Sequence, residues 1–105
     1  MEAKLIWTEL SQNKNGFPIK TDNTVDVFAE EKEIVRSEFY EAMRSGITVK
    51  KILRVRLEDY ELSKHLNNDG KTEYATEIEY DGERYKIIRA YGKGKSKLEL
   101  TCGEA

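Results

Sequence analysis

The stretch T-E-I-E-Y-D-G-E-R-Y-K-I-I-R-A-Y, residues 76–91, decides the fold, and the dipeptide Asp81-Gly82 lies at its centre. Asp-Gly between two alternating runs predicts a two-residue type I′ turn, because aspartate and glycine tolerate the positive φ that both central positions require. A slip of one residue in the pairing would turn charged side chains into the core, so the register is strongly specified. The predicted register pairs Tyr80 with Glu83, Glu79 with Arg84, Ile78 with Tyr85, and Glu77 with Lys86.

Short alternating segments on both sides of this hairpin predict further strands. We expect turns at Asn15-Gly16 and within Asn67–Gly70, because asparagine, aspartate and glycine favour turns, and a solvated loop over Gly92–Ser96. The polar segment Thr21–Thr24 is expected to loop or bulge, and the acidic segment Glu30–Glu33 is expected to end a strand. The expected strands are Lys4–Leu10, Thr24–Ala29, Ile47–Leu57 and Lys97–Cys102.

One helix is predicted over Ser37–Ser45. Ser37 is placed to cap its N-terminus by accepting a hydrogen bond from a free backbone N–H, and Gly46 follows where a left-handed residue often ends a helix. A helix this short is marginal alone, so we expect it to dock through the apolar face that its helical spacing produces. That face consists of Phe39, Ala42 and Met43, and we expect Phe39 and Met43 to pack in the core.

Five or six short strands and one short helix predict a mainly β fold, a small antiparallel β-barrel or sandwich, of which we favour the barrel. The 105 residues fit a single domain, 1–105, without internal repeats. A net charge of −2, with both signs well mixed, predicts no long-range attraction to nucleic acid or to an anionic membrane. The sequence shows no signal-peptide pattern and no apolar run that would cross a bilayer, so we expect a soluble, intracellular protein.

Several motifs that suggest a binding or catalytic site lack residues that such a site requires. The segment Gly92–Ser96 lacks the first glycine of a phosphate-binding loop, whose place is held by Arg89. The segment His65–Gly70 resembles the start of a calcium loop but has histidine at the first ligand position. His65 and Cys102 are the only histidine and cysteine, and that pair alone cannot build a zinc site. We therefore expect no catalytic residues, no metal site, no cofactor and no enzymatic activity, and we expect Cys102 to be a small buried residue.

Lys50, Arg54 and Arg56 form a basic strip on one face of the predicted strand Ile47–Leu57. Such a strip is compatible with a nucleic-acid surface of the kind found on OB-folds. Ion pairing with nearby acids would neutralise it, and this is the interpretation we prefer. The acids concerned are Glu58, Asp59 and Glu61, which follow directly, and Glu77 and Glu79 in the hairpin.

Several segments, taken in order, resemble one family of bacteriophage proteins. The clearest is V-R-S-E-F-Y-E-A at Val35–Ala42, followed by S-G-I-T-V at Ser45–Val49. The chain closes with Y-D-G-E-R-Y-K-I-I-R at Tyr80–Arg89 and L-E-L-T-C at Leu98–Cys102. Together with N-K-N-G-F-P-I at Asn13–Ile19, these segments resemble the head-closure proteins of long-tailed bacteriophages, also called head–tail joining or stopper proteins.

The resemblance implies a structural virion protein, made in the cytoplasm of the host bacterium. Such proteins are small β-barrels that assemble as a ring, here expected to be a dodecamer, below the portal and adaptor rings, where they close the filled head and dock the tail. The implied partners are further copies of the chain, the portal-adaptor protein and a tail-completion or tail-tube protein. DNA only passes through the channel, and no membrane is involved.

The resemblance places the segment Glu30–Gly46 near the channel. An alternative interpretation is a small β-barrel binding module for nucleic acid or a peptide. The candidate interface residues are Tyr40, Glu41, Arg44, Lys50, Arg54 and Arg56.

Overall fold

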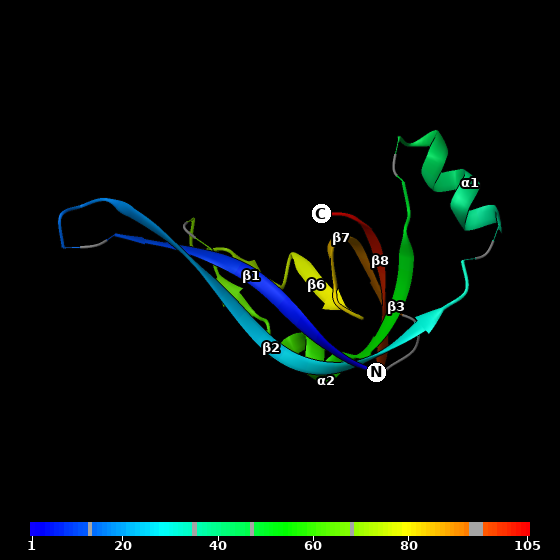
Figure 1. The fold of residues 1–105 in the computed structure, drawn as a ribbon, viewed down its shortest axis with the longest axis horizontal. Helices are drawn as coiled ribbons and strands as arrows, with labels where there is room; N and C mark the ends of the chain where they lie inside the picture. The colour runs from blue at the N-terminus through cyan, green and yellow to red at the C-terminus, as the bar shows by residue number, and fades with distance from the viewer. Residues whose placement is uncertain (13, 35, 47, 68, 93–95) are drawn as a thin grey trace.

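The computed structural model describes residues 1–12, 14–34, 36–46, 48–67, 69–92 and 96–105, and for residues 38, 39 and 42 it describes the backbone alone. Figure 1 shows the course of the chain through its strands and helices. These elements are β1 (Glu2–Gln12), β2 (Pro18–Lys32), α1 (Arg36–Arg44), β3 (Lys51–Arg56), α2 (Leu57–Glu61), β4 (His65–Leu66), β5 (Thr72–Glu73), β6 (Glu77–Tyr80), β7 (Glu83–Gly92) and β8 (Lys97–Glu104).

Six strands form an antiparallel sheet in the order β1-β2-β3-β8-β7-β6, and β4 pairs with β5 separately. Strand β6 also pairs back onto β1, with Ala3 opposite Tyr80 and Ile6 opposite Glu77. Each of the six strands therefore has a partner on both sides along part of its length. We refer to these six paired strands as the ring of strands. The chain is mainly β, as predicted from its alternating segments.

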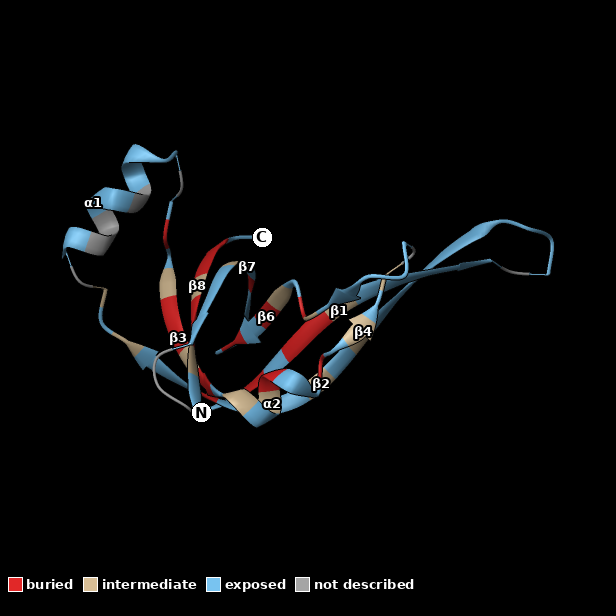
Figure 2. Cartoon of the chain, turned by 180° about the vertical axis from the view of Figure 1, so that it is seen from behind, coloured by how far each residue is buried: buried red, intermediate tan, exposed pale blue. Residues whose placement is uncertain are grey.

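The apolar core lies on the inward face of these six strands, where alternate residues are buried (Figure 2). Leu5, Leu53, Ile78 and Leu100 have no exposed surface. The other members of the core are Ala3, Val27, Ala29, Val55, Tyr60, Ala75, Tyr80, Tyr85 and Cys102.

The hairpin between β6 and β7 has the predicted turn and register. Asp81 and Gly82 adopt φ values of 52° and 79°, in the left-handed region that the turn requires. All four predicted pairs are present. The prediction succeeds because turn chemistry and side-chain alternation specify the same register.

One side chain in this hairpin does not follow its strand partner. Glu79 lies opposite Arg84 as predicted, but the Arg84 guanidinium donates to the diagonal neighbour Glu77 at 2.7 and 3.1 Å. It also lies 3.5 Å from a carboxylate oxygen of Asp22 in β2. A long side chain on a twisted ribbon reaches its diagonal neighbour readily.

Two expectations about the segment that forms strand β2 are wrong. The segment Thr21–Thr24 does not loop but continues the strand, paired with Ile6–Glu9 of β1. Glu30 and Glu31 likewise remain in the strand, because they pair with Arg54 and Leu53 of β3. The polar sequence suggested a loop, but a two-stranded ribbon whose two faces are both exposed to water can form without an apolar face. The predicted turn at Asn15-Gly16 is present, with Gly16 at φ 81°.

Strand β3 is shorter than predicted. Residues 48–50 precede it, Leu57 begins α2, and Ile47 lies outside the described residues. Helix α2 was not predicted from its acidic sequence; it buries Tyr60, whose ring stacks on Tyr74 with centroids 4.9 Å apart. The predicted turn between β4 and β5 is confirmed, with Gly70 at φ 75°.

The ends of the chain's last two strands also differ from the sequence expectations. Strand β7 continues to Gly92, where the loop Gly92–Ser96 was expected to begin, and residues 93–95 lie outside the described residues. Strand β8 extends two residues beyond the predicted Lys97–Cys102, to Glu104.

Helix α1 stands beside β3 and away from the ring of strands (Figure 1). It begins at Arg36, so Ser37 lies within the helix instead of capping it. Gly46 follows with φ 76°, as predicted. The expected core position of Met43 is wrong, because this side chain is 55% exposed, while the side chains of Phe39 and Ala42 lie outside the described part of the structure.

Replacing Gly82 with valine tests the turn between β6 and β7. A β-branched residue at φ 79° is strained, so Gly82→Val should lower the free energy of unfolding by about 1–3 kcal/mol. Lys86→Val is the control, because Lys86 is exposed and lies within β7. Urea unfolding followed by circular dichroism measures both, and equal stabilities of the two variants would contradict the assigned turn.

Candidate functional site

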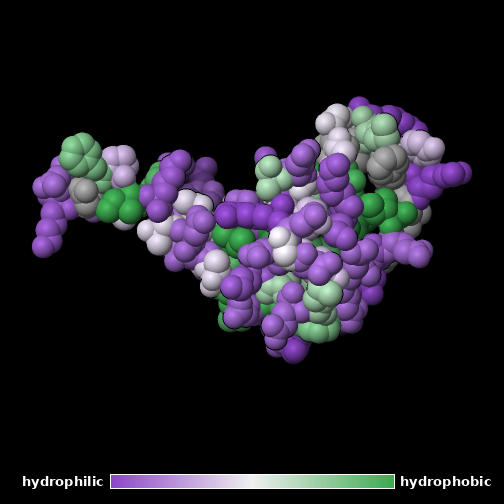
Figure 3. Space-filling model, viewed as in Figure 1, coloured by the Kyte–Doolittle hydropathy of each residue, from purple (hydrophilic) through white to green (hydrophobic). Residues whose placement is uncertain are grey.

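The most conspicuous surface feature is an arm formed by the outer half of the β1–β2 hairpin. Strands β1 and β2 pair along their length, but only Ala3–Ile6 and Ala29–Lys32 also pair with other strands of the ring. From Trp7 to Gln12 the ribbon projects outward for about 20 Å, at roughly 3.4 Å per residue. Figure 3 shows this arm leaving the body, which makes the molecule 51 Å long against 29 and 27 Å across.

The tip of the arm, which we define as Leu10–Lys20, exposes large apolar side chains. Phe17 is 65% exposed, Leu10 48% and Ile19 40%. Leu10 is paired with Lys20, and Ile19 is paired with Ser11, so Leu10 and Ile19 point to opposite faces of the ribbon. Each face of the tip therefore exposes one large apolar side chain, and Phe17 exposes a third beside the turn.

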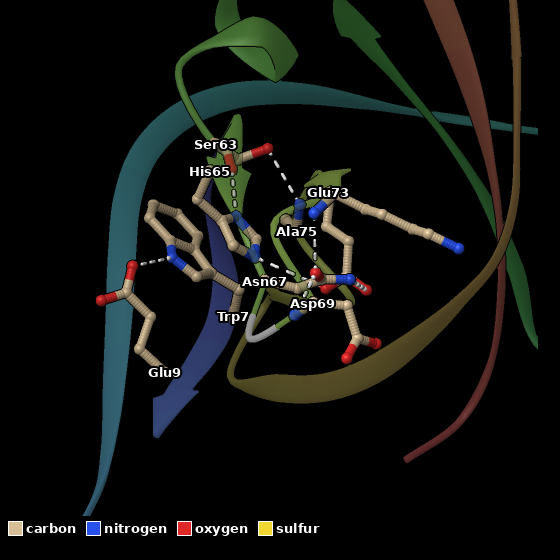
Figure 4. A network of polar contacts seen from close by, with 9 residues as sticks. Trp7, Glu9, Ser63, His65, Asn67, Asp69, Glu73 and Ala75 are labelled. Carbon is tan, nitrogen blue, oxygen red and sulfur yellow. Dashed lines mark hydrogen bonds and ion pairs between the residues drawn. The ribbon is translucent and has the colours of Figure 1, made fainter. Parts of the chain in front are cut away.

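An aromatic stack joins the root of this arm to the β4–β5 segment, and polar contacts within each of the two segments surround it (Figure 4). The Trp7 ring stacks on His65 with centroids 5.3 Å apart and planes 11° apart. The Trp7 Nε1–H donates to Glu9 at 3.2 Å, and Asn67 Nδ2 donates to Glu73 at 2.7 Å. The stack holds the arm against the β4–β5 segment at the point where the arm leaves the ring, while the two hydrogen bonds lie within β1 and within the β4–β5 segment.

The tautomer of His65 is set by its neighbours. Nδ1 lies 2.8 Å from the Ser63 carbonyl oxygen, which only accepts, so Nδ1 carries a hydrogen. Nε2 then faces Glu73 Oε2 at 3.7 Å. The fully buried Ser63 hydroxyl donates to the Tyr60 carbonyl at 2.7 Å and accepts from the Ala75 N–H at 3.0 Å. His65 therefore has a structural role at the root of the arm.

The second surface feature is a cleft between α1 and the outer face of the sheet. It has a volume of about 430 Å³. Glu41 of α1 and Ser45, which directly follows the helix, line one side, and Tyr91 and Glu99 lie on the strands opposite. Ile34, Val49, Ile52, Arg89 and Thr101 complete the lining.

The candidate residues of α1 are all at the surface. Tyr40 is 51% exposed, and Glu41 and Arg44 are exposed as well. Helix α1 thus presents an aromatic side chain and both signs of charge, and Glu41 also faces the cleft.

The basic strip is divided by the structure. Lys50 is exposed and precedes β3, whereas Arg56 is ion-paired with Glu58. Arg54 lies 3.7 Å from Glu99, its strand partner in β8. The strip is thus partly neutralised, as expected, but Arg54 pairs with Glu99 and not with the expected acids of β6, because β8 is the neighbour of β3.

Glu99 was missed in the sequence and is the buried centre of this ionic group. Its residue surface is 8% exposed, and Lys32 Nζ lies 2.9 Å from Oε2 and 3.3 Å from Oε1. Lys32, Arg54 and Glu99 come from β2, β3 and β8, so the group crosses three strands. Only the strand order, which the sequence pattern does not give, could have located it.

The parts of the chain described here assemble no group of three histidine, cysteine, aspartate or glutamate residues that could hold a metal ion. Among the described residues, no helix is both long and apolar enough to span a membrane. Cys102, predicted to be buried, has no exposed surface, and its Sγ lies 3.5 Å from the Leu100 carbonyl oxygen.

No protein-family model matches this chain, and comparisons with curated proteins and with solved structures likewise give no match.

The stack at the root of the arm can be tested through Trp7, the only tryptophan in the chain. His65→Ala removes the stack and the hydrogen bond to Ser63, which should cost about 1–2 kcal/mol of stability and change the Trp7 emission spectrum. Lys64→Ala, at an exposed neighbouring position, should change neither. An unchanged emission spectrum in His65→Ala would contradict the contact.

Burial raises the pKa of the Cys102 thiol to about 12, from 9.0 in an exposed setting. The native thiol therefore stays protonated where the unfolded thiol ionises, so this stabilising contribution is complete below pH 9 and is lost as the pH rises from 9 toward 12. We expect iodoacetamide to label Cys102 slowly in native protein at pH 9 and rapidly in urea. Equal labelling rates, measured by mass spectrometry, would contradict the burial.

Proposed function

We propose that this protein is a structural connector of a bacteriophage or prophage virion, which assembles as a ring below the portal and adaptor and closes the filled head. In this proposal the six paired strands act as a small β-barrel, and each copy contacts its neighbours through elements outside the barrel. The resemblance of Val35–Ala42, Ser45–Val49 and the C-terminal segments to head-closure proteins supplies the biological context.

The observation that carries the proposal is the distribution of exposed apolar surface along the molecule. The arm tip lies at one end of the 51 Å axis, and α1 with Tyr40 and Met43 lies at the other. A 105-residue protein with two projecting contact elements on a small body suits a subunit held between neighbours. The mixed charge of the surface suits contacts whose register is set by complementary patches.

The alternative of a nucleic-acid-binding module is less well supported. Arg54 and Arg56 already lie in ion pairs with Glu99 and Glu58, and the net charge is −2. A protein that neutralises few phosphates binds DNA weakly, because counterion release drives most of that affinity. DNA passing through a channel does not require such affinity.

A direct test combines the purified protein with the portal–adaptor complex of a long-tailed bacteriophage. Electron microscopy should show an additional ring below the adaptor, and its symmetry would test the expected dodecamer. If no ring is added under any condition in which the protein remains folded, the connector proposal is wrong.

The double variant Tyr40→Ala/Glu41→Ala tests the part that α1 plays in that assembly. Both residues are exposed, so the thermal midpoint should stay nearly unchanged, while binding to the portal–adaptor complex should weaken about tenfold or more. Lys64→Ala/Leu66→Ala is the matched control, because it also removes one exposed charge and one exposed apolar side chain. Equal binding by both double variants would exclude α1 from the interface.

A further inference from the structure

We propose that the arm tip of one copy of this chain docks into the cleft beside α1 of a second copy. The inference deepens the proposed connector function. It rests on that function only for the expectation that repeated contacts close into a ring. The contact itself is argued from the shape, the apolar surface and the charge of the two ends of the molecule.

The shape of the tip requires a concave receptor. Leu10 and Ile19 point to opposite faces of the ribbon, and Phe17 stands at its end. A tip laid on a flat surface would bury one face and leave the other in water. Insertion into a cleft covers side chains on both faces, so a cleft buries more of the apolar surface of the tip than a flat surface does.

The cleft beside α1 provides such a receptor. Its volume of about 430 Å³ suits one or two large side chains, and Ile34, Ile52 and Tyr91 give it apolar walls. Tyr91 is 60% exposed at the rim, so an entering apolar side chain would cover surface that is now in contact with water. Phe17 is the most exposed apolar residue of the tip and the natural side chain to enter first.

The charges of the two ends are complementary. The tip, Leu10–Lys20, carries Lys14 and Lys20 and no acidic residue, which gives it a charge of +2. The segment from Glu30 to Ser45, which contains α1, has five glutamates and three basic residues, which gives it −2. The lining of the cleft itself has two acids, Glu41 and Glu99, and one base, Arg89, which gives it −1. Such a pattern attracts the tip to the cleft and repels tip from tip.

A tip that enters this cleft has to come from a second copy, because the arm and α1 of one molecule lie at opposite ends of its 51 Å axis (Figure 1). The two contacting surfaces are different, so the contact is heterologous, and a pair of copies still presents one undocked tip, on one copy, and one unoccupied cleft, on the other. Repeated contacts of this kind produce a closed ring when the rotation between copies closes, and a filament when it does not.

A thiol-exchange reaction tests the contact without needing a stable assembly. Phe17→Cys protein is first converted to its mixed disulfide with thionitrobenzoate. It is then mixed with Tyr91→Cys protein, whose thiolate attacks that disulfide, joins the two chains and releases the thionitrobenzoate anion. The native Cys102 is buried and does not compete.

Leu62→Cys is the matched control for Tyr91→Cys, because Leu62 and Tyr91 are 61% and 60% exposed. We expect Tyr91→Cys to react at least about tenfold faster than Leu62→Cys, because docking raises the local concentration of the two sulfurs. Adding Lys14→Glu and Lys20→Glu to the activated protein should reduce the Tyr91→Cys rate to that of the control. Equal rates for the two cysteines, or a preference that survives both charge reversals, would overturn the proposal.

The outcomes separate this inference from the connector proposal. Equal exchange rates, together with an added ring on the portal–adaptor complex, would reject the tip-in-cleft contact and leave the connector standing. Fast, charge-dependent exchange without any added ring would retain the contact between copies and reject the connector.

Discussion

The pairing of β6 with β1 is the constraint on which the rest of the structure depends. Strand β6 consists of Glu77–Tyr80 alone, and it pairs with only Ala3–Ile6 of β1. The Asp81-Gly82 turn ends β6 on one side, and on the other Thr76 donates its N–H to the Ile6 carbonyl. Because β6 is so short, the remainder of β1 has no partner in the ring other than β2. The arm is a direct result of this difference in strand length.

The hairpin at Asp81-Gly82 could be predicted residue by residue because local information sufficed. The turn dipeptide needs positive φ, and the flanking residues alternate, so two independent constraints give one register. The arm could not be predicted in the same way. Thr21–Thr24 is polar on both faces, and such a sequence is equally typical of a loop. Among the paired strands, only β1 is its backbone partner.

The candidate site was likewise predictable only where local sequence was sufficient. The sequence places Tyr40 and Glu41 away from the apolar face of α1, and both are exposed. It also predicts Met43 in the core, whereas Met43 is 55% exposed because α1 stands away from the ring. The cleft, and the ionic group around Glu99, combine residues from β2, β3, β7 and β8. Such groupings depend on the order of strands in the sheet, and a pattern within one strand carries no information about that order.

The position of β1 in the ring also determines how the protein folds. Ala3 pairs with Tyr80, and Lys51 pairs with Cys102, so the ring cannot close until almost the whole chain is available. The β1–β2 and β6–β7 hairpins need only local contacts and can form early, whereas the pairings between distant segments carry the larger loop-closure entropy. On a ribosome, the arm would therefore be formed while the surface that its own root must join is still being synthesised. The element that reaches furthest from the body is the one whose strands can meet first.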